Sequence, residues 1–207
     1  GQYAAHSVTR TALALAATEN RSEALRLMQL AMTWDPDRPE HYLEAARLLN
    51  ASGQREEALR TCRKSISLWQ KHPDCVTQGA TLAHAYCEMG CLLQDDPDQC
   101  VAAFRHALEL AGTLKEAFEG LEQHYRRLGD TRGCVAEFRS FLERHPDSLL
   151  GSVYLTRALI EANDLDGAEG IAAAALERNP ANPWLLSEKA SIATVREKCI
   201  QAGDCLL

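Results

Sequence analysis

The chain has 207 residues, a formal net charge of −7, and 46% hydrophobic residues. This composition is that of an ordinary globular protein, and the acidic balance argues against general binding to nucleic acid or to anionic membranes. No run of about 18 apolar residues occurs, and charges such as Arg10, Glu23 and Arg26 interrupt the first part of the chain. The sequence therefore predicts neither a transmembrane helix nor a signal peptide.

The first part of the chain contains two helix-turn-helix segments, in which apolar residues recur at helical spacing. The four expected helices cover residues 4–18, 22–34, 39–51 and 55–71. Asn20 or Ser22 can cap the second helix, and Asp35 and Pro36 end it. Gly53 lies in the turn between the third and the fourth helix. Each pair of helices is thus expected to form an αα-hairpin.

The third segment is less regular than the others. We expect a lengthened first helix over residues 74–93 and a turn over 94–98, because Ala58 and Cys100 are 42 residues apart. Taking Gly90 as the usual small residue of the first helix would instead require a turn that is two residues shorter. The register of this hairpin stays open between these two alternatives.

The fourth segment, residues 115–146, has the clearest pattern. Its first helix has an apolar face and its second helix repeats apolar residues at i, i+4 and i+7. These two faces consist of Phe118, Leu121 and Tyr125, and of Cys134, Phe138 and Phe141. Gly129 lies in the turn between the helices, and Pro146 ends the second one. This segment also predicts an αα-hairpin.

The fifth segment pairs helices over residues 149–162 and 166–178, and a single last helix over 183–200 follows it. This last helix carries charged and polar residues that suit the polar outer face of a terminal cap. They are Ser187, Glu188, Lys189, Arg196, Glu197 and Lys198. Residues 201–207 show no helix signal and are expected to form a tail.

A small residue opens the second helix of each hairpin at a nearly constant interval. These residues are Ala24, Ala58, Cys100, Cys134 and Ala168, separated by 34, 42, 34 and 34 residues. Together with Pro36, Pro146 and Pro180, the pattern resembles the tetratricopeptide repeat (TPR) family over residues 5–182. The resemblance implies an all-α fold, a right-handed α-solenoid of about five hairpins with a C-terminal capping helix. We expect one domain over 1–207, with repeats at 5–38, 39–73, 74–114, 115–148 and 149–182.

Two narrower resemblances concern subclasses of this family. In the TPR subclass that binds acidic chaperone tails, Lys and Asn occupy fixed first-helix positions, where this chain has Thr9, Leu13 and Glu44. Residues 82–90 and 124–146 are faintly similar to the TPR protein of bacterial lipopolysaccharide assembly. That family ends in a rubredoxin-like module with two CxxC pairs, which Cys199 and Cys205 do not reproduce.

The chain has eight cysteines, enough for a disulfide framework or a metal site. The helix faces that the pattern assigns to packing carry Cys62, Cys87 or Cys91, Cys100 and Cys134. These positions favour reduced thiols and a cytoplasmic location. His84, Cys87 and Cys91 share one helix face, and Cys100 or His106 could supply a fourth zinc ligand. Since no paired CxxC spacing occurs, we interpret this face as core and predict no metal and no cofactor.

The sequence contains none of the motifs that indicate catalysis or nucleotide binding: GxSxG, HExxH, the P-loop and GxGxxG are all absent. The remaining histidines are scattered along the chain. We therefore expect a protein that is not an enzyme.

The resemblance implies a concave groove lined by the first helices of successive repeats, in which a partner peptide or helix binds. It places nine residues toward this groove: Arg10, Arg47, Asn50, Tyr86, Gln123, Arg126, Arg127, Tyr154 and Arg157. Guanidinium groups bind carboxylates in bidentate geometry, so the recurring arginines favour an acidic protein partner.

Two alternatives belong to other functional classes. The first is an assembly subunit, a homo-oligomer or a component of a complex, that packs through its edges. Leu43, Leu82, Leu150 and the terminal residues 205–207 suggest it. The second is a regulatory domain of a larger enzyme.

Overall fold

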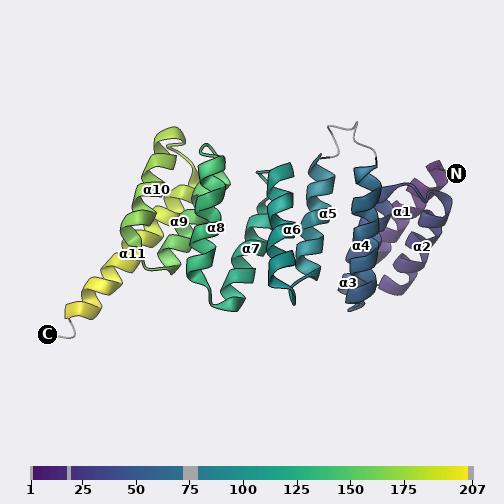
Figure 1. Ribbon diagram of the computed structural model, residues 1–207, viewed down its shortest axis with the longest axis horizontal. Coiled ribbons are helices and arrows are strands. Elements are labelled where there is room, and N and C mark those ends of the chain that lie inside the picture. Colours follow the sequence, from purple (N-terminus) through teal and green to yellow (C-terminus); the bar gives the residue numbers. More distant parts are fainter. Residues whose placement is uncertain (1, 18–19, 72–78, 205–207) are drawn as a thin grey trace. The chain divides into compact units, whose positions relative to one another are not determined.

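The computed structural model describes residues 2–17, 20–71 and 79–204. Within these residues the chain forms eleven α-helices and no β-strand (Figure 1). The helices are α1 (Gln2–Ala17), α2 (Arg21–Trp34), α3 (Pro39–Ala51), α4 (Arg55–Gln70), α5 (Gly79–Leu92), α6 (Pro97–Leu110), α7 (Lys115–Leu128), α8 (Thr131–Arg144), α9 (Leu149–Glu161), α10 (Leu165–Arg178) and α11 (Pro183–Asp204). The predicted all-α fold of successive helical hairpins is confirmed.

The helices belong to two compact units, Gly1–Ala117 and Phe118–Leu207, and the boundary falls within α7. In the first unit α1 packs on α2, α3 on α4, and α5 on α6, with further packing of α2 on α3 and of α4 on α5. In the second unit α9 packs on α8, α10 and α11. A single domain over residues 1–207 stays a prediction.

The small residues that mark the repeat interval are all buried. Ala24, Ala58 and Ala168 have no exposed surface, and the thiols of Cys100 and Cys134 are nearly as buried. Small side chains let neighbouring helices approach closely, so the rest of each apolar face can interlock. In the first unit, for example, Ala58 and Cys62 pack with residues of α3 and α5.

The turns confirm the expected hairpin geometry. Gly53 and Gly129 have φ of +77° and +69°, a region where a side chain is unfavourable. At the start of α8, the Asp130 carboxylate accepts a hydrogen bond of 2.8 Å from the Gly133 backbone N–H. Such caps satisfy backbone donors that have no partner within the helix. Asn20 is the N-cap of α2, but its side chain makes no capping hydrogen bond.

The third hairpin differs from its prediction. Residues 74–78, where the lengthened helix was expected to begin, lie outside the described residues. The expected turn over 94–98 is wrong at its end, because Pro97 and Asp98 already belong to α6. The Asp96 carboxylate accepts a 3.1 Å hydrogen bond from the Gln99 backbone N–H, and Pro97 suits the first helical position.

Gly90 explains the packing of this hairpin. A Cβ atom at this position would lie 2.8 Å from the Phe104 ring, well inside van der Waals contact. Gly90 is thus needed for the close approach of α5 to α6. Gly90 is therefore the small residue of the first helix, and four residues, 93–96, connect α5 to α6, one fewer than in the expected turn.

The last helix also differs from its prediction, since α11 continues to Asp204 and residues 201–204 are helical, not a tail. Leu185 and Ile192 are buried. The expected polar outer face is only partly present, because Glu188 is buried and Arg196 pairs with Asp166 of α10 at 2.6 Å. These polar residues face the helices on which α11 packs. None of the described helices is both long and apolar enough to span a bilayer.

Candidate functional site

The nine residues predicted to line a groove divide between the two units. Arg10, Arg47, Asn50 and Tyr86 lie in the first unit, on α1, α3 and α5. Gln123, Arg126, Arg127, Tyr154 and Arg157 lie in the second unit, on α7 and α9. Every one of them is on the first helix of its hairpin, as the repeat pattern predicted.

In the first unit, Glu88 of α5 joins two of the predicted residues. Its carboxylate accepts a 3.1 Å hydrogen bond from the Asn50 amide and lies 3.8 Å from the Arg47 guanidinium. Arg47 also pairs with Glu44 at 2.8 Å. Arg10 is exposed on α1. The structure therefore brings Arg47 and Asn50 together, but around carboxylates of the chain itself.

Tyr86 belongs to a different set of contacts. Its hydroxyl accepts a 3.0 Å hydrogen bond from the Gln70 amide of α4. Its ring centre lies 5.2 Å from that of His106 on α6. Tyr86 thus connects α5 to the second helices on either side.

In the second unit, two of the predicted arginines, Arg126 and Arg157, take part in a row of alternating charges. The Arg126 guanidinium is 2.8 Å from the Glu161 carboxylate and 3.7 Å from that of Glu122. Arg157 is 3.5 Å from Glu122 and 2.9 Å from Glu188 of α11. We call these five residues, Glu122, Arg126, Arg157, Glu161 and Glu188, the paired face.

Tyr154 lies beneath the paired face. Its side chain is only 2% exposed and stacks on Phe118, with ring centres 5.0 Å apart and an interplanar angle of 11°. The Arg157 guanidinium carbon lies 5.0 Å from the centre of the Tyr154 ring, in a cation–π contact. Burial raises the pKa of Tyr154 to about 12. Its role here is to support Arg157 from within the core.

Gln123 and Arg127 are exposed on α7. One guanidinium nitrogen of Arg127 is 3.4 Å from Nδ1 of His124, which is buried. Burial lowers the pKa of His124, and the nearby positive charge of Arg127 lowers it further. His124 is therefore neutral at neutral pH. The predicted residues of α7 that are exposed to solvent are Gln123, Arg126 and Arg127.

The glutamates are the residues of these two clusters that the sequence analysis did not single out. Glu122 is 7% exposed, and burial raises the pKa of its carboxyl above the ordinary value even though Arg157 and Arg126 lower it. A signal was present, since Glu88 and Glu122 are 34 residues apart, the interval of the repeat. The sequence therefore contained carboxylates at equivalent positions beside the arginines.

Four cysteines of the described residues, Cys62, Cys87, Cys100 and Cys134, are buried as packing residues, whereas Cys91 is exposed. Among these residues no group of three or more His, Cys, Asp or Glu side chains is arranged to hold a metal ion. His84 is engaged with the Ala80 carbonyl oxygen at 2.7 Å. Burial raises the pKa values of the Cys62 and Cys134 thiols to about 12, so both are protonated at neutral pH. The Cys87 thiol donates a hydrogen bond to Cys91, which lowers the pKa of Cys91.

Comparison with known proteins identifies solved structures of similar fold but no relative by sequence. No protein-family model and no curated protein matches the chain. Solved structures do match it, and TTC0263, a thermophilic TPR protein of Thermus thermophilus, is 20% identical. That match covers 92% of this chain and 99% of TTC0263, with a TM-score of 0.50.

Two further structures match at similar levels. PilF of Pseudomonas aeruginosa is 14% identical, covering 98% of this chain and 88% of PilF, with a TM-score of 0.59. YrrB, described as a TPR protein with an unusual peptide-binding site, is 15% identical, covering 88% of this chain and 90% of YrrB, with a TM-score of 0.51. The chain therefore has a TPR-like fold. None of these comparisons supports the fainter resemblance to the lipopolysaccharide-assembly protein.

Proposed function

We propose that this chain is a non-enzymatic scaffold that binds a protein partner on the paired face of its second unit. The observation that carries this proposal is the exposed pair of Arg126 and Glu161, whose side chains are 55% and 38% exposed. Such an exposed pair contributes on the order of 0–1 kcal/mol. A carboxylate of a partner can therefore replace Glu161 at Arg126 with little loss.

Arg157 has a different part in this proposal. Its partners Glu188 and Glu122 have side chains only 11% and 9% exposed, and its guanidinium covers the buried Tyr154 ring. Removing it from these contacts would take the arginine away from the mostly buried Glu188 and leave Glu122 with Arg126 alone. Arg157 and Tyr154 hold the surface in shape, while Gln123, Arg126 and Arg127 of α7 contact the partner.

The partner segment is acidic, a peptide or a helix that brings one or more carboxylates to Arg126 and Arg127. Guanidinium groups bind carboxylates through charge-assisted, often bidentate hydrogen bonds. The likeness in fold to a TPR protein with a peptide-binding site agrees with this class of partner. The free, buried thiols Cys62 and Cys134 suit a reducing, cytoplasmic compartment.

Charge reversal on α7 tests the proposal. Proteins captured from a lysate by the wild-type chain are identified, and their affinities are then measured for Arg126→Glu/Arg127→Glu. We expect a loss of about 1–3 kcal/mol, roughly 5- to 150-fold in affinity. The matched control is Arg132→Glu/Arg139→Glu, which reverses two exposed arginines of α8. Full affinity of the α7 variant, with an unchanged circular dichroism spectrum, would contradict the proposal.

A second candidate function, assembly through an exposed apolar surface, is favoured by α11. Trp184 and Leu186 have 51% and 46% of their surface exposed on this helix. Leu43 was expected at an edge but is buried in the core, and Leu82 packs against the same cluster. Residues 205–207 lie outside the described residues. Sedimentation velocity of the wild type and of Trp184→Ala/Leu186→Ala decides whether these side chains drive self-association.

A further inference from the structure

The outer side of α4 also carries a cluster of cations. Arg60, Arg63 and Lys64 are exposed, and among the described residues none of them forms an ion pair. Several other arginines do have carboxylate partners, for example Arg55 with Asp95 at 2.5 Å and Arg178 with Asp147 at 2.6 Å. In a chain of net charge −7, this local excess of positive charge stands out.

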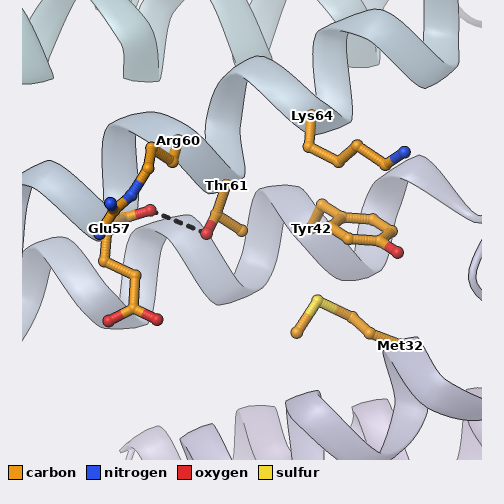
Figure 2. A pocket seen from close by; sticks show the side chains of 6 residues that line it. All are labelled: Met32, Tyr42, Glu57, Arg60, Thr61 and Lys64. Carbon is orange, nitrogen blue, oxygen red and sulfur yellow. Dashed lines mark hydrogen bonds between the residues drawn. The ribbon is translucent and has the colours of Figure 1, made fainter.

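A pocket of about 330 Å³ lies beside these cations, where α2, α3 and α4 meet. Its lining consists of Met32, Tyr42, Glu57, Arg60, Thr61 and Lys64 (Figure 2). In this view the Tyr42 ring lies between Met32 and Lys64. The pocket thus combines an aromatic ring and a thioether with two positively charged side chains and one carboxylate, that of Glu57.

Local hydrogen bonds hold the walls of the pocket. The Tyr42 hydroxyl donates to the Pro36 carbonyl oxygen at 2.9 Å, which orients the ring. The Thr61 hydroxyl donates to the Glu57 backbone carbonyl at 2.8 Å, drawn as a dashed line in Figure 2. Arg60 and Lys64 are one helical turn apart, so they project from the same side of α4. The apolar surface and the cations are therefore presented together.

We propose that this pocket and the cations of α4 form a second docking site for a partner protein. The site binds an acidic segment of that protein, in which an aromatic or aliphatic side chain lies beside the carboxylates. The apolar side chain packs against Met32 and Tyr42, and the carboxylates meet Arg60, Arg63 and Lys64. Because these cations have no ion pair with a described carboxylate of the chain, the partner does not displace one there. This site uses other helices than the paired face, so it does not depend on the function proposed above.

Peptide selection on the full chain tests the proposal. A phage-displayed library of random dodecapeptides is selected on the wild-type protein, and recovered peptides are synthesised and titrated. We expect a class of peptides in which Asp or Glu flanks an aromatic or aliphatic residue. For this class, Arg60→Glu/Lys64→Glu should reduce affinity by at least about tenfold. Arg132→Glu/Arg139→Glu on α8 should leave it unchanged.

Two further variants separate the parts of the proposal. Met32→Gln should also weaken the same peptides, because the apolar side chain loses its contact; full affinity in this variant would mean that charge alone attracts them and would overturn the pocket. Arg126→Glu/Arg127→Glu should weaken only peptides that bind the paired face, so failure of one site is distinguishable from failure of the other. Circular dichroism verifies that each variant is folded.

Other outcomes count against the site. The proposal is overturned if selection recovers no peptide, or if none of the recovered peptides loses affinity when Arg60 and Lys64 are reversed. A single-stranded DNA dodecamer tests whether the site binds nucleic acid instead of an acidic peptide. If it binds through Arg60 and Lys64 with higher affinity than the acidic peptides, the site recognises nucleic acid and the proposal is wrong.

Discussion

The paired face and the outer side of α4 both contain clustered cations, but the two clusters differ in burial and in ion pairing. On the paired face, Arg157 lies over a buried ring and between glutamates that are mostly buried. On α4, Arg60, Arg63 and Lys64 lie in solvent without ion pairs in the described residues. A charge near a low-dielectric core requires a counter-charge, whereas a solvated one does not.

The number of arginines on a helix therefore does not indicate how many of them are available to bind a ligand. Arg157 is committed to internal contacts, Arg126 is exposed but paired, and Arg60 is exposed and unpaired within the described part of the chain. The availability of each guanidinium depends on the burial of its neighbours.

Removing the aromatic core beneath the paired face should have the largest effect. Phe118 is fully buried and contacts Phe138, Phe141 and Tyr154, with ring centres 5.0 to 5.9 Å apart. Phe118→Ala should therefore lower the free energy of unfolding by about 3–5 kcal/mol. Urea denaturation followed by circular dichroism measures it. A loss below about 1 kcal/mol would mean that the paired face does not rest on a packed core.

Removing one cation from each region compares them directly. Arg157→Met keeps an apolar stem over Tyr154 but leaves Glu122 and Glu188 without this counter-charge. We expect the free energy of unfolding to fall by about 1–3 kcal/mol, because a mostly buried carboxylate without its partner is destabilising. Arg60→Met on α4 is the matched control and should change stability by less than about 0.5 kcal/mol.

A rescue experiment completes this comparison. Glu188→Gln in the Arg157→Met background removes one of the stranded charges and should recover part of the lost stability. If Arg157→Met and Arg60→Met have equal effects on urea unfolding, the contrast between the two regions is wrong.

The smallest effect should appear in the pH dependence of stability. Burial raises the pKa of Glu122 in the folded protein, so the native state holds this proton more tightly than the unfolded chain does. As pH rises above the ordinary glutamate pKa of about 4.3, this group's contribution to the free energy of unfolding therefore decreases. Glu122→Gln removes the decrease, so the stability of the variant relative to the wild type should increase with pH through this range. Denaturation midpoints measured between about pH 4 and 7 verify the sign, and a relative stability that is flat or falls with pH would contradict it.

Much of the fold could be predicted because the repeat is a local pattern. The hairpins of α3 and α4 and of α7 and α8 follow from apolar spacing, a glycine turn and a small residue at a fixed position. The third hairpin could not be predicted in the same way. Its turn depends on Asp96 as a cap and on the contact of Gly90 with Phe104, which is a property of two packed helices.

The candidate site was predictable only as a set of positions. Arg126, Arg127 and Gln123 are exposed on α7 as the repeat pattern indicated. The same pattern placed Tyr154 on the surface, but the ring is buried, because Phe118 and Phe138 pack on it from other helices. Spacing along one helix cannot reveal which aromatic side chains a neighbouring helix will cover.

An all-α protein of repeated hairpins follows from the amino-acid sequence alone, because helical periodicity, turn glycines and small residues act within about one repeat length. Which charged side chains form ion pairs, and which are available to a binding partner, depends on the tertiary structure. Arg157 meets Glu122 and Glu188 from different helices, while Arg60 meets none in the described residues. The physical reason is that pairing depends on distance and burial in space, and these are fixed only when the helices pack.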